Sequence, residues 1–211
     1  MIFAVCALFN SCVFSDAQVV WLSTRNMDFT DCDREERQVK EFAGIRNTCP
    51  FDVIYEQSDE QYVIVEGDEE YFGRLHTDVS KGILEISIDP ARYRNVRLRV
   101  KVGSPEISHI SMSGSGSIIC KTDIEADGEL TLKVSGSGDI YAENIGCDIL
   151  ESSVSGSGEI KVSYIDADKV NVSVTGSGDW DADEIESEYL NIVVSGSGDV
   201  EIAEVGIDGS L

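Results

Sequence analysis

The chain has 211 residues, of which 40 are Asp or Glu and 16 are Lys or Arg, so its formal net charge is -24. Because binding to nucleic acid requires clustered positive charge, this composition argues against a nucleic-acid partner. A hydrophobic content of 42% is typical of a folded protein rather than of a disordered one.

Residues 1–12 form an apolar segment that ends at Cys12. No run in the chain approaches the roughly 18 apolar residues of a membrane-spanning helix, so this is the one candidate for a membrane-directed segment. Phe9-Asn10-Ser11-Cys12 is similar to the end of a bacterial lipoprotein signal peptide. The segment lacks the Lys or Arg of a secretory leader, so an apolar core segment is the alternative. We therefore predict a signal segment at 1–12, lipid attachment at Cys12, and a polar tether over 13–36.

The cysteines after this segment are consistent with export. None of them has the CxxC or CxxH spacing of a zinc site; they are Cys32, Cys49, Cys120 and Cys147. In an oxidising compartment, a Cys32–Cys49 disulfide would fix the tether to the domain. The alternative is that both are buried free thiols. Cys120 falls in an apolar column of the repeat described below and is expected in the core.

Residues 37–113 are expected to form the opening strands of a domain that spans 37–211. Runs with strand-like alternation are separated by polar turns; they lie at 53–55, 62–65, 82–88 and 96–102. The last run places Val and Leu on one face and Arg97, Arg99 and Lys101 on the other. This cationic face would either pair with the acidic coils or contact a partner, and pairing within the chain is the simpler interpretation.

Residues 114–211 contain a repeat. Five copies of [Ser/Thr]-Gly-Ser-Gly occur, at spacings of 22, 20, 20 and 20 residues. Their first glycines are Gly114, Gly136, Gly156, Gly176 and Gly196. This period is typical of the coils of a solenoid, in which each repeat contacts only its neighbours.

Apolar residues recur at fixed positions of each copy and alternate with polar ones. Four residues after the first glycine stand Ile118, Ile140, Ile160, Trp180 and Val200. The alternation predicts three short strands per coil, and 20 residues at roughly 3.3 Å each suffice for one circuit. The 22-residue copy matches if its two extra residues precede Ile124. We therefore predict an all-β fold, a parallel β-solenoid with coils of about 20 residues; the alternative is a meander or sandwich of antiparallel hairpins.

The glycines of the repeat have a structural explanation. Glycine at alternate positions lets successive coils approach closely at a corner. The second glycine of each copy is Gly116, Gly138, Gly158, Gly178 or Gly198. The serines between them would form a ladder of hydroxyl groups. We favour turn polarity as the role of this ladder over a hydrogen-bonding rail for a sugar or peptide.

Acidic residues also recur, and they make the second half of the chain the acidic half. Residues 101–211 carry 22 acids and 5 bases, a net charge of -17, against 18 acids and 11 bases, or -7, for residues 1–100. Stacking would align two acidic columns, Asp139, Glu159, Asp179 and Asp199 in one, and Asp148, Asp168, Glu188 and Asp208 in the other. The first column offers carboxylate ligands for calcium. The alternative is a solvated acidic edge that keeps the solenoid soluble and prevents lateral pairing.

The sequence contains no recognisable catalytic motif. Its two histidines, His76 and His109, stand in no nucleophile or zinc motif. We therefore assign no catalytic residue and expect no cofactor. Because some β-solenoids cleave polysaccharides with clustered carboxylates, Asp139, Glu159 and Asp179 are the candidates for an enzymatic alternative.

Several of these features together resemble one family. The run Val39-Lys-Glu-Phe42-Ala-Gly-Ile45, the segment Pro105 to Met112 and the recurrent Ser-Gly-Ser-Gly-Asp-Ile are similar to the bacterial head GIN domain, a family of auto-transporter adhesins common in Bacteroidetes. The resemblance covers about residues 37–211. It implies an all-β, solenoid-like exported protein, often attached through a lipidated cysteine, and it supplies no catalytic residues.

The leading hypothesis is a non-enzymatic β-solenoid lipoprotein of the outer membrane or cell surface that binds an extracellular glycan or protein along its stacked faces. The alternatives are a polysaccharide-active enzyme and a purely structural envelope component. The last copy of the repeat stops at Leu211, before its final strand. We expect an open strand edge there, which a partner or a second copy would cover.

Overall fold

The structure is a computed structural model, and it describes residues 28–206. The first part of the described chain contains seven strands and the 3-10 helix η1 (Glu69–Arg74). The strands are β1 (Asp33–Glu36), β2 (Gly44–Asn47), β3 (Asp52–Gln57), β4 (Tyr62–Gly67), β5 (Leu75–Ser80), β6 (Ile83–Ile88) and β7 (Leu98–Ser104). The four strand-like runs of the sequence lie in β3, β4, β6 and β7.

The segment just before the first glycine turn and the glycine repeat itself form the remaining strands of the described chain. They are β8 (His109–Met112), β9 (Ser117–Cys120), β10 (Ile124–Val134), β11 (Asp139–Val154), β12 (Glu159–Gly176), β13 (Asp179–Glu186), β14 (Tyr189–Gly196) and β15 (Val200–Gly206). Equivalent strands of successive copies pair in parallel, as β11 does with β12. The predicted parallel β-solenoid is therefore confirmed, and the antiparallel meander is wrong.

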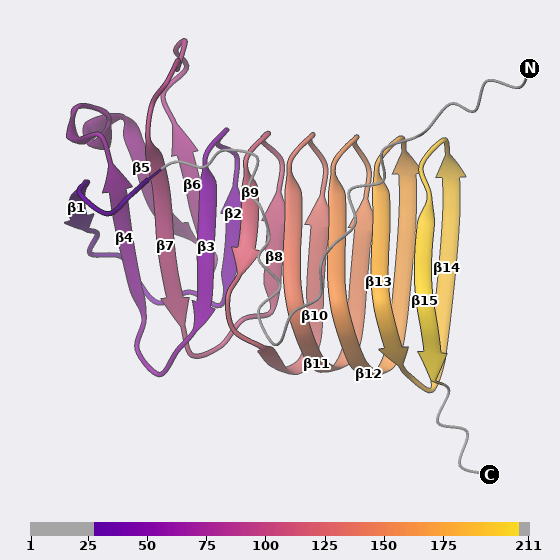
Figure 1. Cartoon of the computed structure of the whole chain (residues 1–211). Helices are drawn as coiled ribbons and strands as arrows, with labels where there is room; N and C mark the ends of the chain where they lie inside the picture. The colour runs from indigo at the N-terminus through magenta and orange to yellow at the C-terminus, as the bar shows by residue number, and fades with distance from the viewer. Residues whose placement is uncertain (1–27, 207–211) are drawn as a thin grey trace, which may run out of the picture.

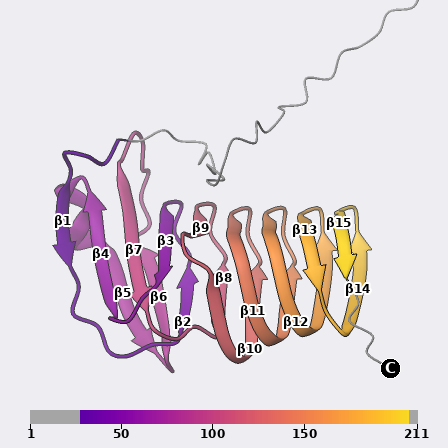
Figure 2. The same cartoon turned by 60° about the horizontal axis from the view of Figure 1, so that its bottom comes forward.

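The solenoid is flattened into two layers (Figures 1 and 2). The front layer contains, in spatial order, β1, β4, β7, β3, β9, the first halves of β11 and β12, β13 and β15. The back layer contains β5, β6, β2, β8, β10, the second halves of β11 and β12, and β14. β11 and β12 each run without a break through all three of the strand regions that the sequence predicts for a coil. Each coil therefore has two sides, one in each layer, and its three predicted short strands are joined into one.

The core lies between the layers, where the apolar columns meet. Ile140, Ile160 and Trp180 stack in register in the front layer, and each is fully buried. Trp180 crosses the core, and its Nε1 donates a hydrogen bond to Ser152 Oγ of the back layer at 2.7 Å. Ser152 interrupts an otherwise apolar column, and this bond explains why a hydroxyl is tolerated there.

The 22-residue copy accommodates its extra residues differently from the prediction. Ile119 pairs with Tyr141, and Ile124 pairs with Ile145, so one extra residue lies before Ile124. The second lies in a register shift between Ala126 and Glu129. Gly128 stands inside this shift with a φ of +87°, a conformation that side-chain-bearing residues rarely adopt. The two extra residues are therefore accommodated at separate places, one before Ile124 and one after Ala126.

The order of the opening strands in space differs from their order in the sequence. β2 pairs with both β6 and β8, and β3 pairs with both β7 and β9. The coil formed by β2 and β3 is therefore inserted between two coils that follow it in the sequence. Beyond it, β1, β4 and β7 pair antiparallel, as do β5 and β6.

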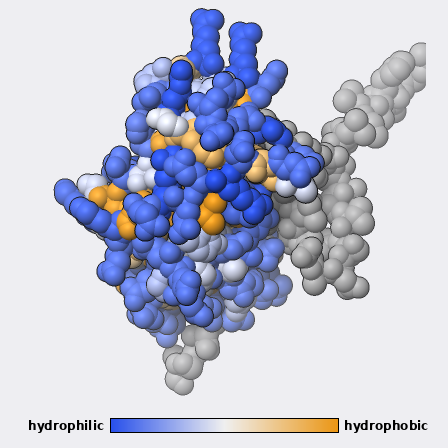
Figure 3. All heavy atoms as spheres, turned by 90° about the vertical axis from the view of Figure 1, so that its left-hand side faces the viewer, coloured by the Kyte–Doolittle hydropathy of each residue, from blue (hydrophilic) through white to orange (hydrophobic). Residues whose placement is uncertain are grey.

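Residues 33–36 form β1, although the sequence predicts that they belong to the polar tether. β1 pairs with β4 over its whole length, so the folded domain begins before residue 37. The end of the solenoid that carries β1, β4 and β5 is mainly hydrophilic (Figure 3). In the described part of the chain, no helix is long and apolar enough to span a membrane.

The Ser-Gly-Ser-Gly turns stack on one another, and the glycines are explained by contact between coils. A Cβ at Gly156 would lie 1.9 Å from the carbonyl oxygen of Gly136, and one at Gly158 would lie 2.0 Å from that of Gly138. The Ser157 N–H donates to Gly136 O at 3.0 Å. The serine backbones thus continue the ladder of hydrogen bonds through the corner.

Candidate functional site

The outward side of the front layer, which we call the front face, carries two rows of mainly polar side chains at matched positions of successive strands, and Ile54 and Ile119 interrupt the second row. One row runs along the solenoid through Arg99, Asp52, Ser117, Asp139, Glu159, Asp179 and Asp199. The next runs through Lys101, Ile54, Ile119, Tyr141, Lys161, Asp181 and Glu201. Both rows change from cationic at β7 to acidic at β15. The charge of the front face therefore changes from positive to negative along the solenoid axis.

The predicted acidic column lies in the first of these rows, and its members bind backbone amides of neighbouring coils. Asp139 Oδ1 accepts the N–H of Glu159, and Asp179 Oδ1 accepts the N–H of Asp199, each at 3.0 Å. Asp52 does the same for Ser117 at 3.2 Å. A carboxylate at this position therefore stabilises the stacking of the next coil.

Glu159 is the carboxylate of this column with the most perturbed environment. Its pKa is raised, first by burial and then by a hydrogen bond and charge repulsion from Asp181. The Tyr141 hydroxyl donates to Glu159 Oε2 at 3.2 Å, and burial raises the pKa of this tyrosine. Glycoside hydrolysis requires two carboxyl groups about 5–5.5 Å or about 6.5–9.5 Å apart. Asp181 instead shares a hydrogen bond with Glu159, and a hydrogen bond between two carboxyl groups requires that one of them carries a proton.

The structure places the calcium candidates in line without gathering them around a common point. Among residues 28–206, no group of three or more His, Cys, Asp or Glu side chains is arranged to hold a metal ion. In the second predicted column, the Glu188 N–H donates to Asp168 O at 3.1 Å, so this column also follows the stacking of the coils. Asp208 lies outside the described residues.

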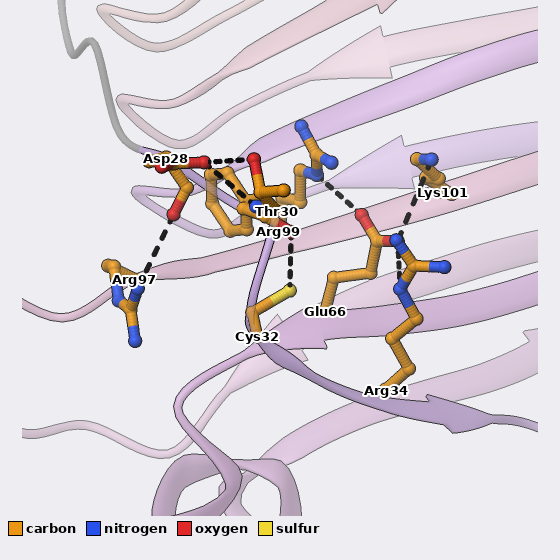
Figure 4. Close-up of polar contacts among 9 residues, drawn as sticks. Asp28, Thr30, Cys32, Arg34, Glu66, Arg97, Arg99 and Lys101 are labelled. Carbon is orange, nitrogen blue, oxygen red and sulfur yellow. Dashed lines mark hydrogen bonds and ion pairs between the residues drawn. The ribbon is translucent and has the colours of Figure 1, made fainter.

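A cationic cluster surrounds Glu66 on the front face at the opposite end from β15 (Figure 4). The Glu66 carboxylate is only 1% exposed and lies 3.0 Å from Arg34 Nε, 2.6 Å from Arg99 Nε and 3.6 Å from Lys101 Nζ. The Arg99 guanidinium also lies over the Phe29 ring, 4.1 Å from its centroid. A buried carboxylate requires such compensation, and here three cations meet one acid.

The cationic face of β7 therefore pairs within the chain, as the simpler interpretation held, but with β4 rather than with the acidic coils. Arg97 binds Asp68 through Nε and Nη2, each 3.2 Å from Oδ1, and its backbone N–H donates to Asp68 Oδ2. Arg97 Nη1 also donates to Asp28 O. Glu66 and Asp68 were missed in the sequence because nothing local indicates which strand lies beside β7.

The cysteines of the described chain are free thiols. Cys32 Sγ donates to Phe29 O at 3.1 Å, and Cys49 is buried in the core, so the Cys32–Cys49 disulfide is absent. Cys120 is buried, as expected. Burial raises the pKa of both Cys49 and Cys120 to about 12, which makes them unreactive. Cys12 lies outside the described residues.

These features define an all-β, parallel β-solenoid with a polar outer face. The chain belongs to the family described as "Putative auto-transporter adhesin, head GIN domain", which matches residues 41–207. No curated protein sequence matches the chain.

Solved structures support the same fold. A "putative adhesin" from Bacteroides fragilis superposes with a TM-score of 0.63 at 17% identity, covering 82% of this chain and 97% of that one. A "putative adhesin" from Parabacteroides distasonis has a TM-score of 0.54 at 20% identity, with coverages of 81% and 96%. At these identities the similarity establishes the fold alone.

Proposed function

We propose that this protein is a non-enzymatic, exported surface protein that binds an extracellular glycan or protein through its front face. The observation that carries the proposal is the pair of outward rows, whose positions repeat from strand to strand. Strands in a sheet are about 4.8 Å apart, so an extended ligand lying along the axis would meet a polar group at each step. The family description supports a role at the cell surface.

The face can be tested with two matched double variants. Tyr164→Ala with Asp181→Lys alters the front face, where the Tyr164 hydroxyl donates to Glu186. Asn171→Ala with Glu151→Lys makes the same change of charge on the back layer, where Asn171 Nδ2 donates to Glu151. Both pairs would be screened against glycan arrays and matrix proteins. We expect loss of binding only in the front variant; equal binding by both variants, or no binding by the wild type, would contradict the proposal.

The raised pKa of Glu159 is the one observation that favours a polysaccharide-active enzyme. That function predicts release of reducing sugars, abolished by Glu159→Gln and unaffected by Glu151→Gln on the opposite layer. Inactivity of the wild type across a broad panel of polysaccharides would remove the enzymatic alternative.

We also propose that the protein is held at the outer membrane by a lipid on Cys12. The support is the similarity of residues 9–12 to the end of a lipoprotein signal peptide. The experiment is metabolic labelling with a fatty-acid analogue in a bacterial host that processes lipoproteins. We expect labelling of the wild type and of Cys6→Ser and none of Cys12→Ser; labelling that persists in Cys12→Ser would refute the anchor.

A further inference from the structure

The last coil of the described chain has strand neighbours on one side only. β14 pairs with β12, and β15 pairs with β13, and neither pairs with a further strand among residues 28–206. Each therefore presents one edge whose alternate N–H and C=O groups point away from the sheet. At the other end of the solenoid, antiparallel strands cover the parallel coils.

The core-facing side chains of this coil are exposed where their equivalents one coil earlier are buried. Ile192 and Val194 are 38% and 46% exposed, whereas their register partners, Val172 and Val174, are at most 1% exposed. Val205 in β15 is 41% exposed. These side chains are therefore exposed because no further strand covers them in either layer of the described chain.

The outward side of β14 carries two exposed apolar residues, beside the polar Asn191 and Ser195, where the preceding coil has polar residues. Tyr189 and Val193 are 68% and 50% exposed, and they stand in register with Lys169 and Ser173. A strand edge with exposed apolar residues on both sides invites pairing with another strand. This edge, formed by β14 and β15, is called the terminal edge below.

The charge around the terminal edge restricts what would pair with it. Residues 170–206 contain nine acids and no Lys, Arg or His. A second copy of the same edge would bring like charges together, which disfavours self-association. A strand with cationic outward side chains would be attracted, provided that its alternate residues are apolar and continue the core columns.

The fold already contains a strand of this chemistry at its other end. Residues 96–102, which end within β7, alternate Val and Leu with Arg97, Arg99 and Lys101, and β7 pairs in parallel with β3. Val100 lies in register with Val53, which lies in register with Ile118. An alternating apolar and cationic strand is therefore compatible with the columns of this solenoid.

We propose that the terminal edge binds a strand of another protein in which apolar and cationic residues alternate. The strand adds to the terminal edge by backbone hydrogen bonding, its apolar residues cover the exposed core columns, and its cations lie near the exposed acidic residues of β15, Glu201 and Glu204. This surface is distinct from the front face, so failure of one proposal leaves the other standing.

The probe is a labelled peptide with the sequence of residues 95–104, Asn-Val-Arg-Leu-Arg-Val-Lys-Val-Gly-Ser. One control peptide carries Glu in place of its three cations, and a second carries Pro in place of the residue equivalent to Val100, which disrupts strand pairing. Binding to the full chain is measured by fluorescence anisotropy. We expect both control peptides to bind at least about tenfold more weakly than the probe.

Two protein variants with the same change of charge locate the binding. Val194→Lys alters the terminal edge at an exposed position, and Thr131→Lys alters the back layer in the middle of the solenoid. Circular dichroism verifies that both remain folded. We expect Val194→Lys to weaken binding at least about tenfold and Thr131→Lys to change it by less than about twofold. Hydrogen exchange should show protection of β14 amides on addition of the probe.

Four results would overturn the proposal. Equal binding of the three peptides would mean that backbone pairing and charge do not determine binding, and equal binding by Val194→Lys and wild type would place the site elsewhere. Sedimentation that shows a dimer, dissociated by Val194→Lys, would assign the edge to a second copy. Protection of the β14 amides in the free monomer, lost on deletion of residues 207–211 or 1–27, would assign it to this chain.

Discussion

Substitution of Gly156 by alanine should force two stacked coils apart. The new Cβ would lie 1.9 Å from the carbonyl oxygen of Gly136 and 2.9 Å from its carbonyl carbon. Both atoms belong to the backbone, so no side chain can rotate to relieve the overlap. The same carbonyl accepts the Ser157 N–H at 3.0 Å, and separating the coils strains that bond as well.

The magnitude follows from these two contacts. Overpacking of a rigid site costs about 3 kcal/mol, at the upper end of the usual range, because only backbone atoms can move. Loss of one buried hydrogen bond costs about 1 kcal/mol more. The total of about 4 kcal/mol is a large share of a typical stability of about 5–15 kcal/mol.

Urea unfolding followed by far-UV circular dichroism measures this loss, and two other glycines separate its causes. A Cβ at Gly73 meets nothing within 4 Å, so Gly73→Ala should change the free energy of unfolding by less than about 0.5 kcal/mol. A Cβ at Gly128 also meets nothing, but its φ is +87°, so Gly128→Ala should cost about 1–2 kcal/mol through backbone strain alone. If Gly156→Ala were no less stable than Gly73→Ala, close stacking would not be the reason for the repeated glycine.

Three further predictions concern side chains. Glu66→Gln should cost about 2 kcal/mol in urea unfolding, because three cations lose their buried acid; a change below about 0.5 kcal/mol would contradict this. Ser152→Ala should cost about 1–3 kcal/mol by leaving the Trp180 N–H unpaired in the core, whereas the neighbouring Ser153→Ala should be nearly neutral. Because the pKa of Glu159 is raised in the folded state, the stability of the wild type falls as the pH rises from the ordinary value of 4.5 through the folded-state pKa. Glu159→Gln should therefore be more stable than the wild type at neutral pH, and it should have no such advantage below this pH range. Equal dependence of stability on pH in the two proteins would refute this.

The coils could be predicted from the sequence because their determinants recur. Ile140, Ile160 and Trp180 occupy the same position of successive copies, and a 20-residue period brings equal positions into register. The glycines were predictable for the same reason, since Gly136 and Gly156 meet through the period that separates them. A repeat converts a long-range contact into a local pattern.

The start of the domain lacked that advantage. Nothing in the sequence indicates that β2 lies between β6 and β8, because the contacts join residues that share no repeat. The same limit applies to the cationic cluster. The sequence shows that Arg99 is a cation on an alternating strand. It does not show that Arg99 binds Glu66, because only the strand order of the folded sheet places β4 beside β7.

The acidic column illustrates how one pattern supports several interpretations until contacts are known. Calcium binding, catalysis and solubility each explain why Asp139, Glu159 and Asp179 recur. The hydrogen bonds from the amides of the next coil supply a fourth explanation, since a carboxylate at this position stabilises the following turn. At Asp199 the column ends at a coil with no partner strand beyond it among the described residues. An acid that serves stacking inside the solenoid thus becomes, at its end, part of the charge that favours a cationic strand.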